Sequence, residues 1–222
     1  VRGIAYATIF AEFIATIYVF YRIKKMTNFF DNIKIKDFFP KIQLQIDIFR
    51  QAFPASINMF SVGAGFFIIT FFVSFFPTAD TSDISIAAYG IAIRIEQIIL
   101  LPAIGLNFAC LSLVSQNYGS ANYGRIKEGY IICLKYCFIL LTLGGLVLFF
   151  GASFFMSIFT NDLKIINIGT NYLKIAALFT PILGVLNISI SLLQGIKKPN
   201  STMLISLFKE LIGVVILIFL FA

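Results

Sequence analysis

Histidine and tryptophan are absent from this chain of 222 residues, and charged residues make up only 12% of it. Without histidine, the chain lacks the side chain that most often transfers protons and binds metal ions near neutral pH. The charged fraction is about half that of an ordinary soluble domain, so a soluble globule would have to cover its surface with Phe, Ile and Leu. Acid–base enzymes, metalloenzymes and soluble globular proteins are therefore poor candidates.

Long stretches of the chain contain no Asp, Glu, Lys or Arg. These charge-free runs cover residues 51–79, 97–124, 136–161 and 175–196. The spans 3–21 and 201–221 are equally apolar except for Glu12, Lys209 and Glu210. A helix needs roughly 20 apolar residues to cross a bilayer core. We therefore predict an all-α, polytopic membrane protein with six transmembrane helices, because a signal peptide would explain only one such stretch.

The net charge of +7 comes from basic residues that are sorted by loop. They gather in the first, third and fifth connections between apolar spans: Arg22, Lys24, Lys25, Lys34, Lys36, Lys41, Arg50, Arg125, Lys127, Lys197 and Lys198. This asymmetry predicts that the odd-numbered connections face the cytoplasm. The aromatic and basic interleaving of a nucleic-acid module is absent, so we expect a lipid bilayer and no nucleic acid as partner.

The one long polar connection, residues 24–52, contains an ambiguous segment. From Ile42 the sequence Ile-Gln-Leu-Gln-Ile-Asp-Ile alternates with period two, which alone favours a strand. However, Ile42, Ile46, Phe49 and Phe53 also share one helical face, and a lone strand at a membrane surface would have an unpaired edge. We therefore predict an amphipathic interfacial helix that leads into the second span.

Polar residues inside the spans are the best candidates for a functional site, because ionisable and amide side chains are costly in hydrocarbon. The third span has a stripe of small and polar residues at helical spacings: Tyr89, Ala92, Glu96, Ala103, Asn107 and Cys110. Arg94 projects to another side of this helix, and Pro102 predicts a kink. The fifth span has a second stripe: Thr180, Gly184, Asn187, Ser191 and Gln194.

From these patterns we predict a substrate cavity or an ion-coupling site. The candidates are Glu96, Asn107, Asn58, Asn187, Gln194, Glu12 and Glu210. Helix packing alone explains the Ser, Thr and Gly residues of the stripes, and it competes evenly with function for the four amides. For Glu96 the functional interpretation is favoured, because a carboxylate is a costly way to pack a helix. Glu210 has a simpler explanation as a neighbour of Lys209.

The three cysteines, Cys110, Cys133 and Cys137, all lie in apolar spans. Cys133 and Cys137 share a helix face, but His is absent and no carboxylate is near to complete a metal site. We therefore predict buried, small hydrophobic residues, with no metal ligands and no catalytic residues.

Several short segments resemble a known family of transporters. Residues 3–8 (Gly-Ile-Ala-Tyr-Ala-Thr) resemble a pattern in the sixth helix of multidrug and toxic compound extrusion (MATE) transporters. Residues 87–96 with Pro102, and residues 116–122 (Gln-Asn-Tyr-Gly-Ser-Ala-Asn), look like the eighth helix and the cytoplasmic loop after it. Residues 193–199 are similar to the end of the tenth helix. The order and spacing agree over nearly the whole chain.

The resemblance implies that the six spans correspond to helices six to eleven of a twelve-helix protein built as two lobes. Residues 1–23 would be the last helix of the N-terminal lobe, residues 24–52 the cytoplasmic linker, and residues 53–222 an incomplete C-terminal lobe with five helices. The chain would be a fragment that has the remainder of the N-terminal lobe as a partner, in a bacterial inner membrane.

The family also implies an activity. Its members export organic cations or other amphipathic compounds in exchange for sodium ions or protons, by alternating access and without a cofactor. Some members place acidic coupling residues in the seventh and tenth helices, but the corresponding second and fifth spans here contain no Asp or Glu. We therefore expect coupling to depend on the remainder of the N-terminal lobe, with Glu96 contributing to the central cavity.

The alternative within the same superfamily is a lipid-linked oligosaccharide flippase. Such a protein needs a larger groove, usually lined by several Arg and Lys residues that hold a pyrophosphate. Arg94 is the one basic residue clearly deep in a span, which favours the exporter. An enzyme is disfavoured because the sequence offers no nucleophile with a base, no metal-ligand cluster and no Gly-rich phosphate loop.

Overall fold

The computed structural model describes residues 2–26, 41–75 and 82–216. Over these ranges the chain forms helices joined by short turns and contains no strand. Six helices in this described part are long and apolar enough to cross a membrane. The predicted all-α fold with six transmembrane helices is therefore confirmed.

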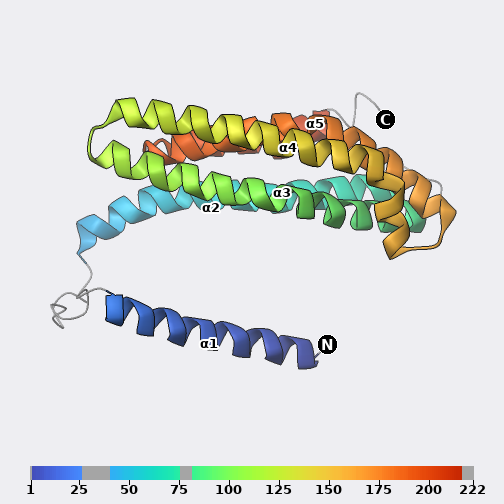
Figure 1. Ribbon diagram of the computed structural model, residues 1–222, viewed down its shortest axis with the longest axis horizontal. Helices are drawn as coiled ribbons and strands as arrows, with labels where there is room; N and C mark the ends of the chain where they lie inside the picture. Colours follow the sequence, from blue (N-terminus) through green and yellow to red (C-terminus); the bar gives the residue numbers. More distant parts are fainter. Residues whose placement is uncertain (1, 27–40, 76–81, 217–222) are drawn as a thin grey trace. The chain divides into compact units, whose positions relative to one another are not determined.

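Figure 1 shows the helices coloured along the chain. They are α1 (Arg2–Met26), α2 (Ile42–Phe75), α3 (Ser82–Gly119), α4 (Tyr123–Phe159), α5 (Leu163–Gly195) and α6 (Pro199–Leu207), which continues into a π-helix, η3 (Phe208–Gly213). The chain divides into two compact units, Val1–Phe49 and Arg50–Ala222.

The segment that alternates with period two is helical. The helix α2 begins at Ile42 and continues to Phe75 without a break, with Pro54 inside it. Helix is therefore confirmed over strand for this segment, whose backbone hydrogen bonds are satisfied within the helix. Its position at the membrane surface stays a prediction. Residues 27–40 of the predicted linker lie outside the described residues.

Two tight turns bring α3, α4 and α5 together as neighbours. Between α3 and α4, Ala121 adopts a positive φ of 56°, and the Asn122 side chain accepts a hydrogen bond from the Arg125 backbone N–H at 3.3 Å. Between α4 and α5, the Asp162 carboxylate accepts from the Lys164 backbone N–H at 2.8 Å. These caps satisfy backbone donors that the first helical turn leaves unpaired.

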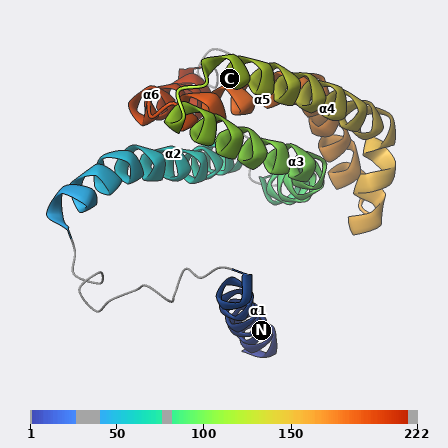
Figure 2. The ribbon, with the colours of Figure 1, turned by 60° about the vertical axis from the view of Figure 1, so that its left-hand side comes forward.

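The core of the second unit lies between α3, α4 and α5, which run side by side in both views (Figures 1 and 2). One apolar cluster is nearer the start of α3 and includes Ala92, Ile95, Leu148, Met156 and Leu173. The other is nearer the end of α3 and includes Cys110, Val114, Cys137, Leu141 and Ile188. The small residues of the predicted stripe on α3 therefore face protein, as the sequence indicated.

Large apolar side chains cover the outside of the helices. On α4, Phe138, Phe150 and Phe154 are exposed, Phe150 to 82%. A surface of this kind is unfavourable in water and suits contact with lipid chains, because the backbone polar groups along the middle of the helix are hydrogen-bonded within it.

Candidate functional site

A hydrogen bond between α3 and α5 lies at the centre of the predicted polar stripe. The Tyr172 hydroxyl of α5 donates to the Glu96 carboxylate of α3, with 3.1 Å between Oη and Oε2. Both side chains are partly buried. A third ring completes the group, because Tyr89 packs edge-to-face on Tyr172 with 5.4 Å between ring centroids. We call Tyr89, Glu96 and Tyr172 the tyrosine–glutamate cluster.

Helix geometry places this cluster inside an apolar stretch. Glu96 is 14 residues after the first residue of α3, a rise of about 20 Å along the helix axis. Tyr89 lies two turns earlier and so points to the same side. Tyr172 belongs to α5, and its ring packs against the apolar cluster that contains Ala92 and Ile95 of α3. The cluster is therefore built on two rigid helices.

The nearest cation in sequence does not neutralise Glu96. Arg94 is exposed, as expected for a residue two positions away on a helix. The part of the chain that the structure describes contains one ion pair, which joins Lys209 and Glu210 with 2.7 Å between Nζ and Oε1. The carboxylate of Glu96 is therefore held by a neutral phenol.

Two of the predicted amides carry unsatisfied polar atoms. Asn107 Oδ1 and Asn58 Nδ2 are buried and have no hydrogen-bond partner among the described residues. Asn187 and Gln194 are half-buried on α5. The backbone carbonyl of Asn187 accepts a hydrogen bond from the Ser191 hydroxyl at 3.2 Å. A buried amide atom without a partner costs free energy, so such atoms are expected where a ligand or water completes them.

Glu210 belongs to a distortion that the sequence did not reveal. It lies in η3, a π-helical turn, and its side chain is only 18% exposed. A Cβ atom placed on Gly65 of α2 would lie 3.0 Å from the Glu210 carbonyl oxygen and 3.1 Å from its Oε2. Glu210 therefore packs closely against α2 at Gly65. Glu210 forms an ion pair with its sequence neighbour Lys209, with 2.7 Å between Oε1 and Nζ.

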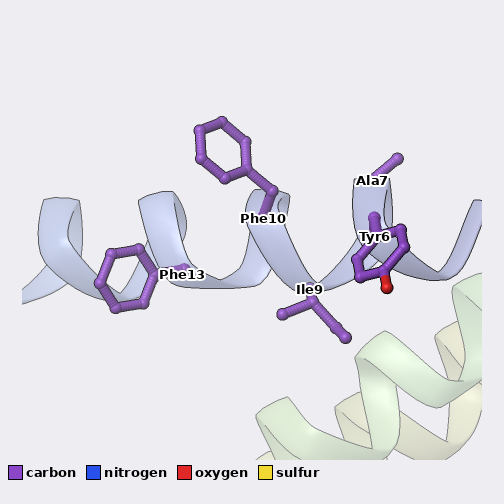
Figure 3. A pocket seen from close by; sticks show the side chains of 5 residues that line it. All are labelled: Tyr6, Ala7, Ile9, Phe10 and Phe13. Atoms are coloured by element: carbon purple, nitrogen blue, oxygen red, sulfur yellow. The ribbon is translucent and has the colours of Figure 1, made fainter. Parts of the chain in front are cut away.

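Glu12 lies in the first compact unit, on α1, and is exposed. Its backbone carbonyl accepts from the Thr16 hydroxyl at 2.8 Å. A shallow hollow of about 500 Å³ on α1 has an apolar lining that does not include Glu12, formed by Tyr6, Ala7, Ile9, Phe10 and Phe13 (Figure 3). The residues that line this hollow are apolar and carry no charge.

Among the described residues, no hydrogen bond or ion pair joins two of the seven predicted site residues to each other. Sequence reasoning missed Tyr172, the partner of Glu96. A tyrosine in an apolar helix commonly donates its hydroxyl to a polar group between helices. This tendency is the sequence signal that could have pointed to Tyr172. The partner itself is 76 positions away in the chain.

The three cysteines are buried, as predicted. Cys110, Cys133 and Cys137 are free and buried in the core between the helices. The described residues contain no group of three His, Cys, Asp or Glu side chains that could hold a metal ion.

The helical fold, its apolar surface and the acid held inside it define a polytopic helical membrane protein. The chain belongs to the MatE family, whose model matches residues 54–219. It is 30% identical over 183 residues to the probable multidrug resistance protein NorM of Thermotoga maritima, covering 81% of this chain and 37% of that protein. It is 28% identical to the probable multidrug resistance protein YpnP of Bacillus subtilis, covering 96% of this chain and 45% of that protein.

A solved structure shows the same fold. An outward-facing multidrug resistance MATE family transporter of the MOP superfamily superimposes with a TM-score of 0.83, at 20% identity, over 94% of this chain and 46% of that one. The chain thus spans less than half the length of each of these proteins. Members of this family are transporters and not enzymes, and this chain is a multi-pass protein of the bacterial plasma membrane. The matches do not favour the oligosaccharide flippase.

Proposed function

We propose that the complete protein is a secondary active transporter. It exports organic cations or other amphipathic compounds in exchange for sodium ions or protons, by alternating access. Glu96 contributes to the central cavity, and the main coupling acid lies in the remainder of the N-terminal lobe. Family membership and the names of the relatives support export of drug-like compounds.

The observation that carries this proposal is the hydrogen bond from Tyr172 to Glu96. A carboxylate in an apolar helix is costly unless it is paired or protonated. Its partner here is a phenol, which carries no charge at neutral pH and can rotate away. The carboxylate can therefore exchange its hydrogen bond for a proton, a sodium ion or the cationic group of a substrate. Each of these neutralises the negative charge, which the phenol does not.

The unsatisfied amides support a cavity for polar and apolar groups together. Asn107 Oδ1 can accept a hydrogen bond from a substrate, and Asn58 Nδ2 can donate one. Asn187 and Gln194 are half-buried and provide further amide groups on α5. A few convergent polar groups among apolar side chains are typical of sites for amphipathic ligands.

The charge distribution supports the position of the main coupling acid. From Leu163 to Gly195, α5 contains no Asp or Glu, and α2 contains none after Asp47. A coupling residue must bind a cation and release it on the other side of the membrane. Glu210 is already paired with Lys209. Of the two acids inside the apolar spans of the second unit, Glu96 and Glu210, only Glu96 has no ion pair among the described residues.

The test uses the complete protein reconstituted in vesicles and loaded with a fluorescent organic cation. An inward sodium gradient and an inward proton gradient are applied separately. We expect gradient-dependent loss of the cation, and a drop of at least about tenfold for Glu96→Gln, since the variant keeps the shape but loses the negative charge. Glu128→Gln is the matched control, because Glu128 is exposed near the start of α4, and its efflux should stay within about twofold.

Two results would overturn the proposal. Equal efflux with and without both gradients would contradict ion-coupled export. Unchanged gradient-driven efflux for Glu96→Gln would exclude Glu96 from the cavity and leave the transport proposal to rest on the family alone.

A further inference from the structure

A polar hollow of about 500 Å³ lies where α3 ends and α4 begins. Ser112, Gln116 and Asn117 line it from the last turns of α3, and Ser120 lines it from the turn that follows. Arg125 lines it from the first turns of α4. The tight turn that joins these helices is visible at one end of the α3–α4 pair in Figure 1. This hollow is separate from the tyrosine–glutamate cluster.

The charge in the hollow has one sign. Arg125 is the only ionisable residue among the lining residues, and its guanidinium forms no recorded ion pair in the described part of the chain. The first backbone N–H groups of α4 add a partial positive charge near Arg125, because the helix macrodipole is positive at this end. The hollow is therefore suited to an anion.

The lining also has hydrogen-bond donors to spare. Gln116 Nε2 donates to Ser112 Oγ at 3.2 Å, and Asn117 Nδ2 donates to the Leu113 carbonyl at 2.8 Å. Each amide nitrogen carries a second N–H, and the Ser112 hydroxyl keeps its own proton. Together with the planar fork of Arg125, these donors fit the oxygens of a phosphate group. The amide oxygens of Gln116 and Asn117 can accept from neighbouring hydroxyls.

The position along α3 favours a phosphate that belongs to a lipid. The apolar stretch of α3 gives way to Ser112, Ser115, Gln116 and Asn117 over its last two turns, and this change marks the end of the hydrocarbon core. The same connection is one of those that the basic residues assign to the cytoplasmic side, where anionic lipids attract Lys and Arg. A headgroup at this depth would reach the hollow without leaving the bilayer.

We propose that the hollow at the α3–α4 turn binds the headgroup of an anionic phospholipid with a single phosphodiester and free hydroxyls, such as phosphatidylglycerol. Arg125 pairs with the phosphate, and Ser112 and Gln116 bind its oxygens or the glycerol hydroxyls. The site is distinct from the proposed transport cavity, and it holds whether or not the protein exports drugs.

Native mass spectrometry of the complete, delipidated protein tests this proposal. Phosphatidylglycerol and phosphatidylcholine with the same acyl chains are titrated separately, and bound lipids are counted. We expect one phosphatidylglycerol that binds more tightly than any phosphatidylcholine. Arg125→Gln should weaken the binding of that lipid by about tenfold, which corresponds to the loss of one charge-assisted hydrogen bond. Lys127→Gln removes a cation of the same helix that does not line the hollow, and should change binding less than about twofold.

Three results would overturn the proposal. Equal retention of the two lipids by the wild type would show no headgroup site. An equal loss in Arg125→Gln and Lys127→Gln would show a diffuse attraction to positive charge. Displacement of phosphatidylglycerol by an equal concentration of inorganic phosphate would show a site for free anions. Gln116→Leu provides a second variant that keeps every charge. It should weaken the binding of phosphatidylglycerol less than Arg125→Gln does.

Discussion

The helix α5 packs against two neighbours in different ways. Toward α4 the contact is close and mostly apolar, since a Cβ on Gly145 would lie only 2.7 Å from the Ala177 carbonyl oxygen. One hydrogen bond, between the Tyr130 and Ser189 hydroxyls at 2.9 Å, crosses this interface. Toward α3 the contact includes the partly buried acid, because the Tyr172 hydroxyl donates a hydrogen bond to Glu96.

The two sides of α5 therefore have different roles: the α4 side stabilises the fold, and the α3 side takes part in the proposed transport. In a bilayer the hydrophobic effect does not drive helices together, so close backbone approach through small residues supplies much of the association energy. The α4 side of α5 does this with glycine. The α3 side includes a carboxylate, which stabilises packing poorly and costs desolvation. Changes on the α4 side should therefore alter stability, and changes on the α3 side should alter transport.

The largest effect on stability is expected for Gly145→Ala. The new methyl group would meet a backbone oxygen of α5, which cannot move away as a side chain can. Overpacking of this kind costs about 2 kcal/mol, so thermal unfolding of the purified protein should occur several degrees lower.

Gly105→Ala is the control for this prediction. Nothing lies within 4 Å of a Cβ at Gly105, and alanine is the better helix former, so Tm should stay the same or rise slightly. An equal Tm for Gly145→Ala and the wild type would contradict the close α4–α5 contact.

The second prediction concerns the two tyrosines that reach across from one helix to another. Tyr172→Phe keeps the ring and its contact with Tyr89 but removes the hydroxyl that donates to Glu96. Loss of a hydrogen bond to a carboxyl group should lower gradient-driven efflux roughly three- to tenfold. Efflux from reconstituted vesicles provides the measurement.

Tyr130→Phe removes the matching hydroxyl from the α4–α5 interface. Its efflux should remain within about twofold of the wild type. If Tyr130→Phe slows efflux as much as Tyr172→Phe does, the proposed difference between the two sides of α5 is wrong.

Much of this arrangement could be predicted from the sequence, because it depends on local composition. Charge-free runs are a property of consecutive residues, and they indicated four of the spans; the other two were indicated by apolar stretches with one or two charges. Spacings of three and four placed Glu96, Ala92 and Cys110 on one face of α3, and Ala92 and Cys110 are fully buried there. A glycine such as Gly145 permits close packing, but its place in the sequence does not identify Ala177 as the neighbour.

The features that were missed depend on which residues meet across helices. Tyr172 has the same local pattern as many aromatic residues in this chain, and only the parallel placement of α3 and α5 brings its hydroxyl to Glu96. The π-helical turn from Phe208 to Gly213 also has no local signature. It lies where Glu210 meets Gly65 of α2, and such turns commonly occur near functional or strained contacts.

The smallest effects are expected at the ion pair of η3, which gives a direct comparison with Glu96. Glu210 has its own cation, since Lys209 Nζ lies 2.7 Å away and the two side chains are 31% and 18% exposed. Glu210→Gln leaves the ammonium group partly buried without its partner, which should lower stability by about 1 kcal/mol. Efflux driven by either gradient should change less than about twofold, because an acid that is already paired does not need a transported cation.

The double variant Lys209→Gln with Glu210→Gln tests the cause of that loss. Removing both charges also removes the uncompensated ammonium, so Tm should return close to that of the wild type. A double variant that is less stable than Glu210→Gln would show that Lys209 has a second role in the last span. Loss of gradient dependence in Glu210→Gln, with full gradient dependence in Glu96→Gln, would reverse the assignment of the two acids and place the exchangeable cation beside η3.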